Sequence, residues 1–202
     1  MKTKGLLFGI ALTTMAAVVY TAAPAAEKPN TEMTLAALGS PAPDFVLKDA
    51  YGKEFKLSEF KDKVVVLEWL NQDCPVSRGT HQKKIMQDTY KKYADKGVIW
   101  LGVCSTAGEK PDRDRVYAAA QGLAYPILHD VDGKVGHAYQ AKTTPHMFVI
   151  DKTGKLAYTG AIDDRKDKNY VATAVDELLE GKPVSTPKTE PYGCGVKYGS
   201  NK

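Results

Sequence analysis

The sequence predicts an α/β fold in which a central mixed β-sheet is flanked by helices. A nearly continuous apolar run over residues 64–70, interrupted only by Glu68, is typical of a strand buried on both faces of a sheet. Strand-like and helix-like segments alternate after it, which favours parallel strand pairs. Two hairpins, over residues 45–57 and 147–158, add antiparallel strands and make the sheet mixed.

The N-terminal β-hairpin is expected where the apolar residues 45–47 and the alternating residues 54–57 flank a polar turn. The first long helix is expected as one continuous element over residues 75–96. Pro75 suits the first position of a helix, and Gly97 suits the position just after its end.

The later elements are predicted in the same way, from segments whose apolar residues have the spacing of a strand or of a helix. The last helix has the clearest pattern, with apolar residues at i, i+3, i+4, i+7 and i+8 counted from Val171. In chain order we expect a strand over residues 98–103, a helix over 111–121, a short strand over 125–128, a short helix over 132–139, the hairpin over 147–158 and a helix over 169–180.

The chain is expected to hold one domain with an extension at each end. Residues 1–26 are typical of an export signal, since two lysines precede an uncharged apolar run over residues 6–19 and cleavage is expected near Ala25 or Ala26. An uncleaved membrane anchor is the alternative, although the run is short for a span of about 20 residues. After cleavage no stable membrane span is expected. The remaining parts are a linker over residues 27–39, a domain over 40–181 and a tail over 182–202.

The composition restricts the classes of function. The 202 residues carry a formal charge of +4, with 43% hydrophobic and 26% charged residues, values that are ordinary for a globular protein. The sequence has no basic stripe with interleaved aromatic residues, so we expect no nucleic-acid partner. The three cysteines, Cys74, Cys104 and Cys194, are too few for a disulfide-stapled small protein and indicate one redox pair with one extra thiol.

Cys74 lies where the apolar strand leads through a short polar turn into the helix that begins at Pro75. The N-terminus of a helix carries a partial positive charge, which favours the thiolate over the thiol. Since the thiolate is the reactive form, this position indicates thiol chemistry at Cys74. Glu68 lies in the preceding strand, where a buried carboxylate is costly unless it has a partner or a proton.

The strand–cysteine–helix segment, the Thr144-Pro145 pair before a strand and the final helix together resemble the thioredoxin-like superfamily. The resemblance covers residues 40–181 and is greatest to the redoxin branch, which includes AhpC/TSA-type and TlpA/ResA-type proteins. It implies a thioredoxin-like fold with an N-terminal β-hairpin. In the tail, the sequence around Cys194 also resembles a terminal cysteine motif of some redoxin-domain proteins.

The resemblance also implies roles for individual residues. Cys74 matches the nucleophilic cysteine of the family, and Glu68 matches a buried acid that serves as general base during disulfide exchange. The Thr-Pro pair matches the family's cis-proline loop, which presents its backbone to a substrate. The residues expected to bind the substrate are Pro75, Ser77, Thr144 and Pro145.

Ser77 stands where thioredoxins carry a second cysteine, so the motif that begins at Cys74 cannot resolve a mixed disulfide by itself. The resolving thiol must then be Cys194, Cys104, a cysteine of a second chain or an external thiol. Cys194 is the preferred candidate, because its flanking glycines indicate a flexible tail that can fold back over the site. Cys104 is expected to be a packed residue at the end of a strand.

We therefore expect an exported thiol–disulfide oxidoreductase that acts on a thiol- or disulfide-bearing protein or small molecule. The alternative is a peroxiredoxin-type peroxidase, in which Cys74 reacts with a peroxide and becomes a sulfenic acid. Leu67 and Asn71 replace the proline and the threonine or serine of the peroxiredoxin motif, which disfavours this alternative. A non-catalytic binding module is disfavoured by the position of Cys74 and by Glu68.

No metal or cofactor is expected. The histidines form no spaced ligand cluster with the cysteines, and the spacings typical of copper delivery and of haem attachment do not occur. The sequence specifies neither the external reductant nor the oligomeric state.

Overall fold

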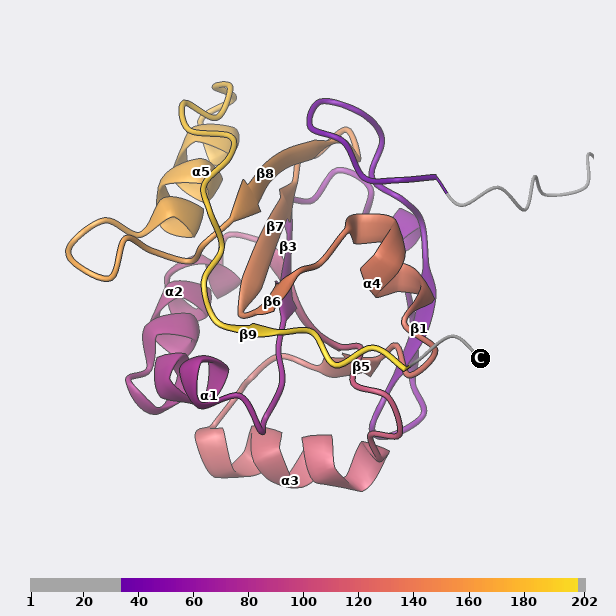
Figure 1. Ribbon diagram of the computed structural model, residues 1–202. Helices are drawn as coiled ribbons and strands as arrows, with labels where there is room; N and C mark the ends of the chain where they lie inside the picture. Colours follow the sequence, from indigo (N-terminus) through magenta and orange to yellow (C-terminus); the bar gives the residue numbers. More distant parts are fainter. Residues whose placement is uncertain (1–33, 200–202) are drawn as a thin grey trace, which may run out of the picture. The chain divides into compact units, whose positions relative to one another are not determined.

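Seven strands form one mixed sheet in the order β2-β1-β5-β4-β3-β7-β8 in the computed structural model, which describes residues 34–199 (Figure 1). These strands are β1 (Val46–Asp49), β2 (Glu54–Lys56), β3 (Val65–Trp69), β4 (Ile99–Cys104), β5 (Ile127–His129), β7 (His146–Ile150) and β8 (Leu156–Gly160). β3, β4 and β5 are parallel, and the other neighbouring pairs are antiparallel. The predicted mixed sheet with its N-terminal hairpin is confirmed.

A second, two-stranded sheet joins β6 (Thr143–Thr144) to β9 (Cys194–Gly195), two segments that are distant in the sequence. The predicted export signal over residues 1–26 and the first part of the predicted linker, residues 27–33, lie outside the described residues.

Five α-helices and one 3-10 helix connect the strands within the described residues. They are η1 (Leu57–Phe60), α1 (Pro75–Gln82), α2 (Ile85–Ala94), α3 (Pro111–Gln121), α4 (Lys134–Tyr139) and α5 (Tyr170–Leu179). Within residues 34–199 no helix is both long enough and apolar enough to cross a membrane.

The core lies on both faces of β3, because successive side chains of a strand point to opposite faces. Val65, Leu67 and Trp69 join one apolar cluster, and Val66 joins the other with the buried residues of α2 and α5. By the same alternation, Glu68 points to the face of Val66. Every residue of β3 is buried, so any polar group there needs a partner inside the protein.

The predicted single helix over residues 75–96 is wrong, since two helices, α1 and α2, occupy that segment. The chain turns at Lys84, whose backbone is left-handed with φ 61°. The carbonyl of His81 in the last turn of α1 accepts hydrogen bonds from the Lys84 N–H at 3.0 Å and from Gln87 Nε2 at 3.0 Å. These bonds satisfy a group that a helix end leaves unpaired, so the break needs no glycine or proline.

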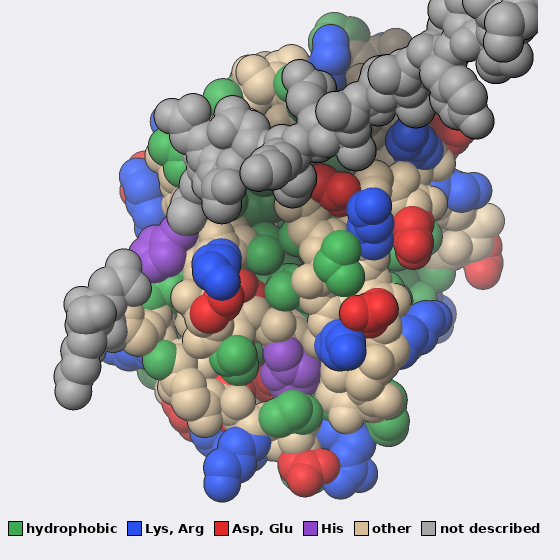
Figure 2. Space-filling model, turned by 90° about the vertical axis from the view of Figure 1, so that its right-hand side faces the viewer, with side chains coloured by type: hydrophobic (Ala, Val, Ile, Leu, Met, Phe, Trp, Pro, Cys, Tyr) green, Lys and Arg blue, Asp and Glu red, His purple; other side chains and the backbone are tan. Residues whose placement is uncertain are grey.

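The strand predicted over residues 125–128 begins two residues later, as β5 (Ile127–His129), directly after Pro126, which has no N–H to donate to a neighbouring strand. Figure 2 shows one face of the molecule, on which Lys and Arg side chains alternate with Asp and Glu side chains. On the visible part of this face the charges are therefore mixed.

Candidate active site

Cys74 is the N-cap residue of α1, directly after the turn that follows β3. Its sulfur accepts a hydrogen bond from the Ser77 N–H at 3.4 Å and donates one to the Thr144 carbonyl at 3.1 Å. Only 3% of Cys74 is exposed. The sulfur thus lies between the first turn of a helix and the loop that precedes β7.

The pKa of the Cys74 thiol lies below its ordinary value, although the largest single influence, burial, acts to raise it. Hydrogen bonds from the Cys194 side chain, the Ser77 N–H, the Thr144 side chain and the Cys194 N–H together outweigh burial. A hydrogen bond to the charged form of a group stabilises that form. The site therefore favours a thiolate at Cys74.

Cys194 lies beside Cys74 because β9 pairs with β6, with Cys194 opposite Thr144 and Gly195 opposite Thr143. The pKa of the Cys194 thiol is raised, first by its hydrogen bond to Cys74, then by burial and by the negative charge of Cys74. The Val76 N–H acts in the opposite direction. Of the two cysteines, Cys74 is thus the more acidic, and neither forms a disulfide in this structure.

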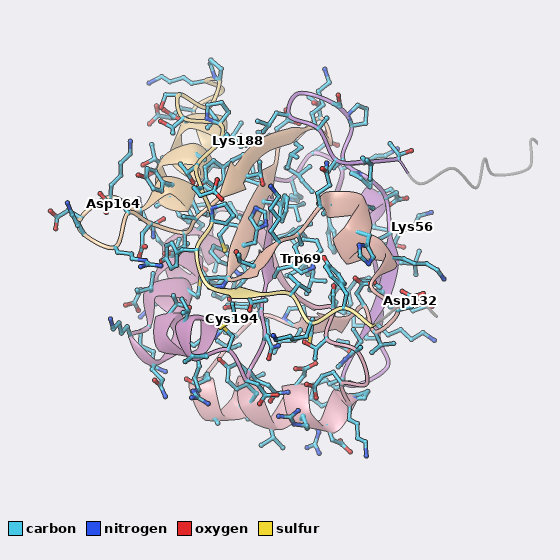
Figure 3. All side chains as sticks on the ribbon, viewed as in Figure 1. Lys56, Trp69, Asp132, Asp164, Lys188 and Cys194 are labelled. Carbon is cyan, nitrogen blue, oxygen red and sulfur yellow. The ribbon has the colours of Figure 1, made fainter. Side chains whose placement is uncertain are left out.

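The tail expected to be flexible is instead held along the domain. Residues 187–198, which we call the C-terminal strap, run from β8 across β6 and on towards α4 (Figure 1). Lys188 and Cys194 lie on this one extended segment (Figure 3). The docking of the strap, rather than its flexibility, brings Cys194 to the site.

Two polar anchors hold the ends of the strap. Near its start, Thr189 Oγ1 accepts from the Ala161 N–H at 2.9 Å and lies 2.6 Å from the Tyr158 hydroxyl. Near its end, Tyr198 donates to the Ala141 carbonyl at 2.8 Å and stacks on His137 with ring centroids 4.1 Å apart. β9 lies between the two anchors.

Glycine makes the approach of the strap possible at Gly193. Its φ of +135° is rarely adopted by other residues, and a Cβ there would lie 2.1 Å from the Thr144 carbonyl oxygen. At Gly195, by contrast, a Cβ would lie 3.9 Å from its nearest neighbour, which is ordinary contact. Position 193 therefore requires glycine for steric reasons, whereas position 195 does not.

Glu68 is fully buried and is bound by three aromatic or imidazole side chains. Its Oε2 accepts from the Tyr125 hydroxyl at 2.8 Å and from Trp100 Nε1 at 3.3 Å. Its Oε1 lies 2.8 Å from His81 Nε2, an ion-pair distance without hydrogen-bond angles. Among the described residues no hydrogen bond joins Glu68 to Cys74.

His81 and Tyr117 extend this network towards the cysteines, and the sequence analysis assigned them no role. His81 Nδ1 lies 2.7 Å from the Tyr117 hydroxyl. The pKa of Tyr117 is raised by burial first, then by the charge of Glu68, and to a smaller extent by that of Cys74. His81 follows Cys74 by seven residues, two turns of α1, and this spacing was the available signal.

The residues expected to bind a substrate surround Cys74. Pro75 begins α1, and the Thr144–Pro145 peptide bond is cis, as the resemblance implied. Ser77 is fully buried and contacts the sulfur through its N–H, while its hydroxyl accepts from the Asn71 N–H at 3.4 Å. Ser77 thus contacts Cys74 through its backbone, while its side chain binds the preceding turn.

Cys104, the other candidate resolving thiol, is buried at the end of β4. Burial, followed by the charge of Asp114, raises the pKa of its thiol to about 12. A thiol with such a pKa contributes little thiolate near neutral pH, so Cys104 is suited to packing.

Comparison with known proteins identifies the family. The AhpC/TSA family matches residues 38–159, which is more than half of the chain. The chain belongs to the AhpC/TSA family. It is 37% identical, over 127 residues, to "Thiol-disulfide oxidoreductase ResA" of Geobacillus thermodenitrificans (strain NG80-2), a match that covers 62% of this chain and 70% of the relative. The protein of that name in Bacillus subtilis (strain 168) is 30% identical over 135 residues, covering 66% of this chain and 73% of the relative.

Solved structures agree with this assignment. A hypothetical protein from Sinorhizobium meliloti 1021 superposes with a TM-score of 0.75 and 30% identity, covering 82% of this chain and 96% of that one. An uncharacterised conserved protein from Geobacillus kaustophilus gives the same TM-score with 27% identity, covering 82% of this chain and 94% of that one. The thioredoxin-like fold is confirmed, and this AhpC/TSA protein is an oxidoreductase.

The pKa of Cys74 can be tested in the reduced protein by the pH dependence of its alkylation. Since the lowered pKa leaves thiolate at lower pH, the midpoint should lie below that of a free cysteine. Replacing Cys194 by Ala removes the neighbouring thiol donor and should move the midpoint to higher pH, whereas Cys104→Ala should not move it. A midpoint unchanged by Cys194→Ala would mean that Cys194 does not stabilise the thiolate.

Docking of the strap can be tested by Gly193→Ala, with Gly195→Ala as the matched control. Overpacking and backbone strain each cost about 1–3 kcal/mol, so Gly193→Ala should lower the docked population by roughly tenfold or more. Hydrogen exchange of the β9 amides should then increase sharply, while Gly195→Ala should leave it nearly unchanged. Equal exchange in both variants would contradict this account of Gly193.

Proposed function

We propose that this AhpC/TSA protein is an exported thiol–disulfide oxidoreductase in which Cys74 is the nucleophile and Cys194 resolves the mixed disulfide. The observation that carries the proposal is the pairing of β9 with β6, which places Cys194 opposite Thr144, the residue whose carbonyl accepts from the Cys74 sulfur at 3.1 Å. The similarity to proteins named thiol–disulfide oxidoreductase supports the reaction class.

The reaction has two steps. The Cys74 thiolate attacks a disulfide of the substrate, which forms a mixed disulfide on Cys74 and releases one substrate thiolate. The Cys194 thiol then loses its proton and attacks the Cys74 sulfur, which releases the second substrate thiolate and leaves a Cys74–Cys194 disulfide. The substrate gains two electrons from the two cysteines. Because Cys74 is almost fully covered, the strap must shift while a substrate reaches its sulfur.

Glu68 is proposed to accept the proton that Cys194 loses, acting through His81 and Tyr117. Tyr117 supports this role, because its hydroxyl contacts His81 and its pKa responds to the charges of both Glu68 and Cys74. A buried carboxylate with a partnered imidazole can hold a proton where water is excluded.

The peroxidase alternative gains no support from the positions of the two replaced motif residues. Leu67 is fully buried in the apolar core, and Asn71 Oδ1 accepts from the Asp73 N–H at 2.7 Å. Neither side chain supplies the hydroxyl that the threonine or serine of the peroxiredoxin motif carries.

Export is proposed from the sequence of residues 1–26. Sequencing of the N-terminus after expression of the full chain in a bacterium with an outer membrane should find the mature protein outside the cytoplasm, starting near Ala26 or Glu27. An uncut chain in the cytoplasmic fraction would contradict export.

Cysteine variants test the assignment of the two steps with an oxidised protein substrate. Cys74→Ser should abolish reduction, because no nucleophile remains. Cys194→Ala should still attack and should accumulate the mixed disulfide on Cys74, detectable by mass spectrometry. Cys104→Ala should turn over normally. Accumulation in Cys104→Ala instead of Cys194→Ala would make Cys104 the resolving residue, and rapid sulfenic acid formation with hydrogen peroxide but no exchange would favour the peroxidase.

Glu68→Gln tests the proton acceptor without deleting the hydrogen-bond acceptor for Tyr125 and Trp100. The resolution rate should fall roughly tenfold or more near neutral pH and should recover as the pH rises, because hydroxide replaces the lost base. Tyr125→Phe is the control, since it removes one hydrogen bond but keeps the carboxylate. Identical pH–rate profiles for Glu68→Gln and the unaltered protein would remove Glu68 from the mechanism.

A further inference from the structure

The two sulfurs of the site differ in their access to solvent. Cys74 is 3% exposed, and its sulfur is enclosed by the Ser77 N–H, the Thr144 carbonyl and the strap. Cys194 is half-buried and lies on the strap, on the outer side of Cys74. A disulfide between them keeps this order, with Cys74 inside and Cys194 outside.

We propose that an external thiol reduces the Cys74–Cys194 disulfide by attacking the sulfur of Cys194. The substrate then forms its mixed disulfide with Cys74, and the reductant forms its mixed disulfide with Cys194. The inference rests on the proposed function, because it needs that disulfide. It goes further by assigning to Cys194 the contact with the reductant.

The direction of attack is the main reason. A thiolate approaches a disulfide along the line of the S–S bond, from the side opposite the sulfur that leaves. Approach to Cys74 along that line comes from inside the protein, where Ser77 and Thr144 occupy the space. Approach to Cys194 along the same line comes from outside the strap.

The leaving group favours the same direction. A thiolate of lower pKa leaves a disulfide faster. The Ser77 N–H donates to the Cys74 sulfur, and the pKa of the Cys74 thiol is lowered while that of the Cys194 thiol is raised. Attack on Cys194 therefore releases the sulfur that the site is built to hold as an anion.

Space for the reductant exists beside residues that are close to the two cysteines in the sequence, although neither cysteine lines it. A surface groove of about 330 Å³ is bordered by Pro75, Val76 and Tyr192, which flank the two cysteines in the sequence. Lys83, Arg165 and Lys166 also line it, with Asp163 as the single acidic residue, whose Oδ1 accepts from the Tyr192 hydroxyl. A lining with more positive than negative charge suits an attacking thiolate.

The exchange balances in two steps. The reductant thiolate bonds to the Cys194 sulfur, the Cys74–Cys194 bond breaks, and its electron pair remains on Cys74 as a thiolate. A second thiolate of the reductant then attacks the reductant sulfur of the mixed disulfide and forms the oxidised reductant. Cys194 leaves as a thiolate and takes up a proton. Two reductant thiols thus supply the two electrons that restore the enzyme.

The test uses the full mature protein, oxidised to its intramolecular disulfide and mixed with glutathione as the probe. The reaction is quenched with acid within the first turnover, free thiols are alkylated, and the peptides are mapped by mass spectrometry. The glutathione adduct should be on Cys194, in roughly tenfold or greater excess over Cys74, with Cys74 alkylated. Cys104→Ala should give the same distribution.

Because the adduct can move from one cysteine to the other after the first attack, a second probe measures accessibility through the reaction rate instead of the position of the adduct. A thiol-terminated polyethylene glycol should reduce the disulfide at a rate similar to that of a small thiol of the same pKa, because Cys194 is accessible. An adduct mainly on Cys74, with a large loss of rate for the bulky thiol, would overturn the inference and leave the proposed function intact. Failure to form the Cys74–Cys194 disulfide at all would overturn both.

Discussion

The antiparallel pairing of β9 with β6 is the contact on which the site depends. It holds Cys194 opposite Thr144, the same residue whose carbonyl lies 3.1 Å from the Cys74 sulfur. One loop therefore positions both cysteines, although they are 120 positions apart in the chain. Sheet pairing supplies the proximity that a Cys-x-x-Cys motif would supply within a single helical turn.

This arrangement also moves the acidity of the two thiols in opposite directions. The helix N-terminus and the strap lower the pKa of Cys74, and the resulting anion raises the pKa of Cys194. A nucleophile and a leaving group need a stable thiolate, whereas a resolving thiol must remain protonated until its turn. The geometry thus separates the roles of the two cysteines.

The parts of the fold that local periodicity determines were predicted well. The buried strand around Leu67, both hairpins and the last helix follow from apolar spacing alone. The break at Lys84 was missed, because it has no glycine or proline and depends on Gln87 binding the end of α1. The order of the strap was missed because its anchors, Thr189 and Tyr198, bind residues far away in the sequence.

In the candidate site, too, the features with a local sequence signal were predicted and those that depend on distant contacts were not. Cys74 and the Thr144-Pro145 loop carry local signals, and the sequence indicated both. The sequence identified Glu68 as an unusual buried acid but gave no partner for it. Its partners, Tyr125, Trp100 and His81, lie outside β3, and only the folded packing brings them to the carboxylate.

The central claim, that the docked strap makes Cys194 the partner of Cys74, is tested most directly by their effective concentration. The reduced protein is equilibrated in glutathione redox buffers, and the fraction with each disulfide is measured by mass spectrometry. A docked strap predicts a Cys74–Cys194 disulfide with an effective concentration well above the millimolar range that flexible linkers give. A value within that range, or a disulfide between Cys74 and Cys104, would contradict the account.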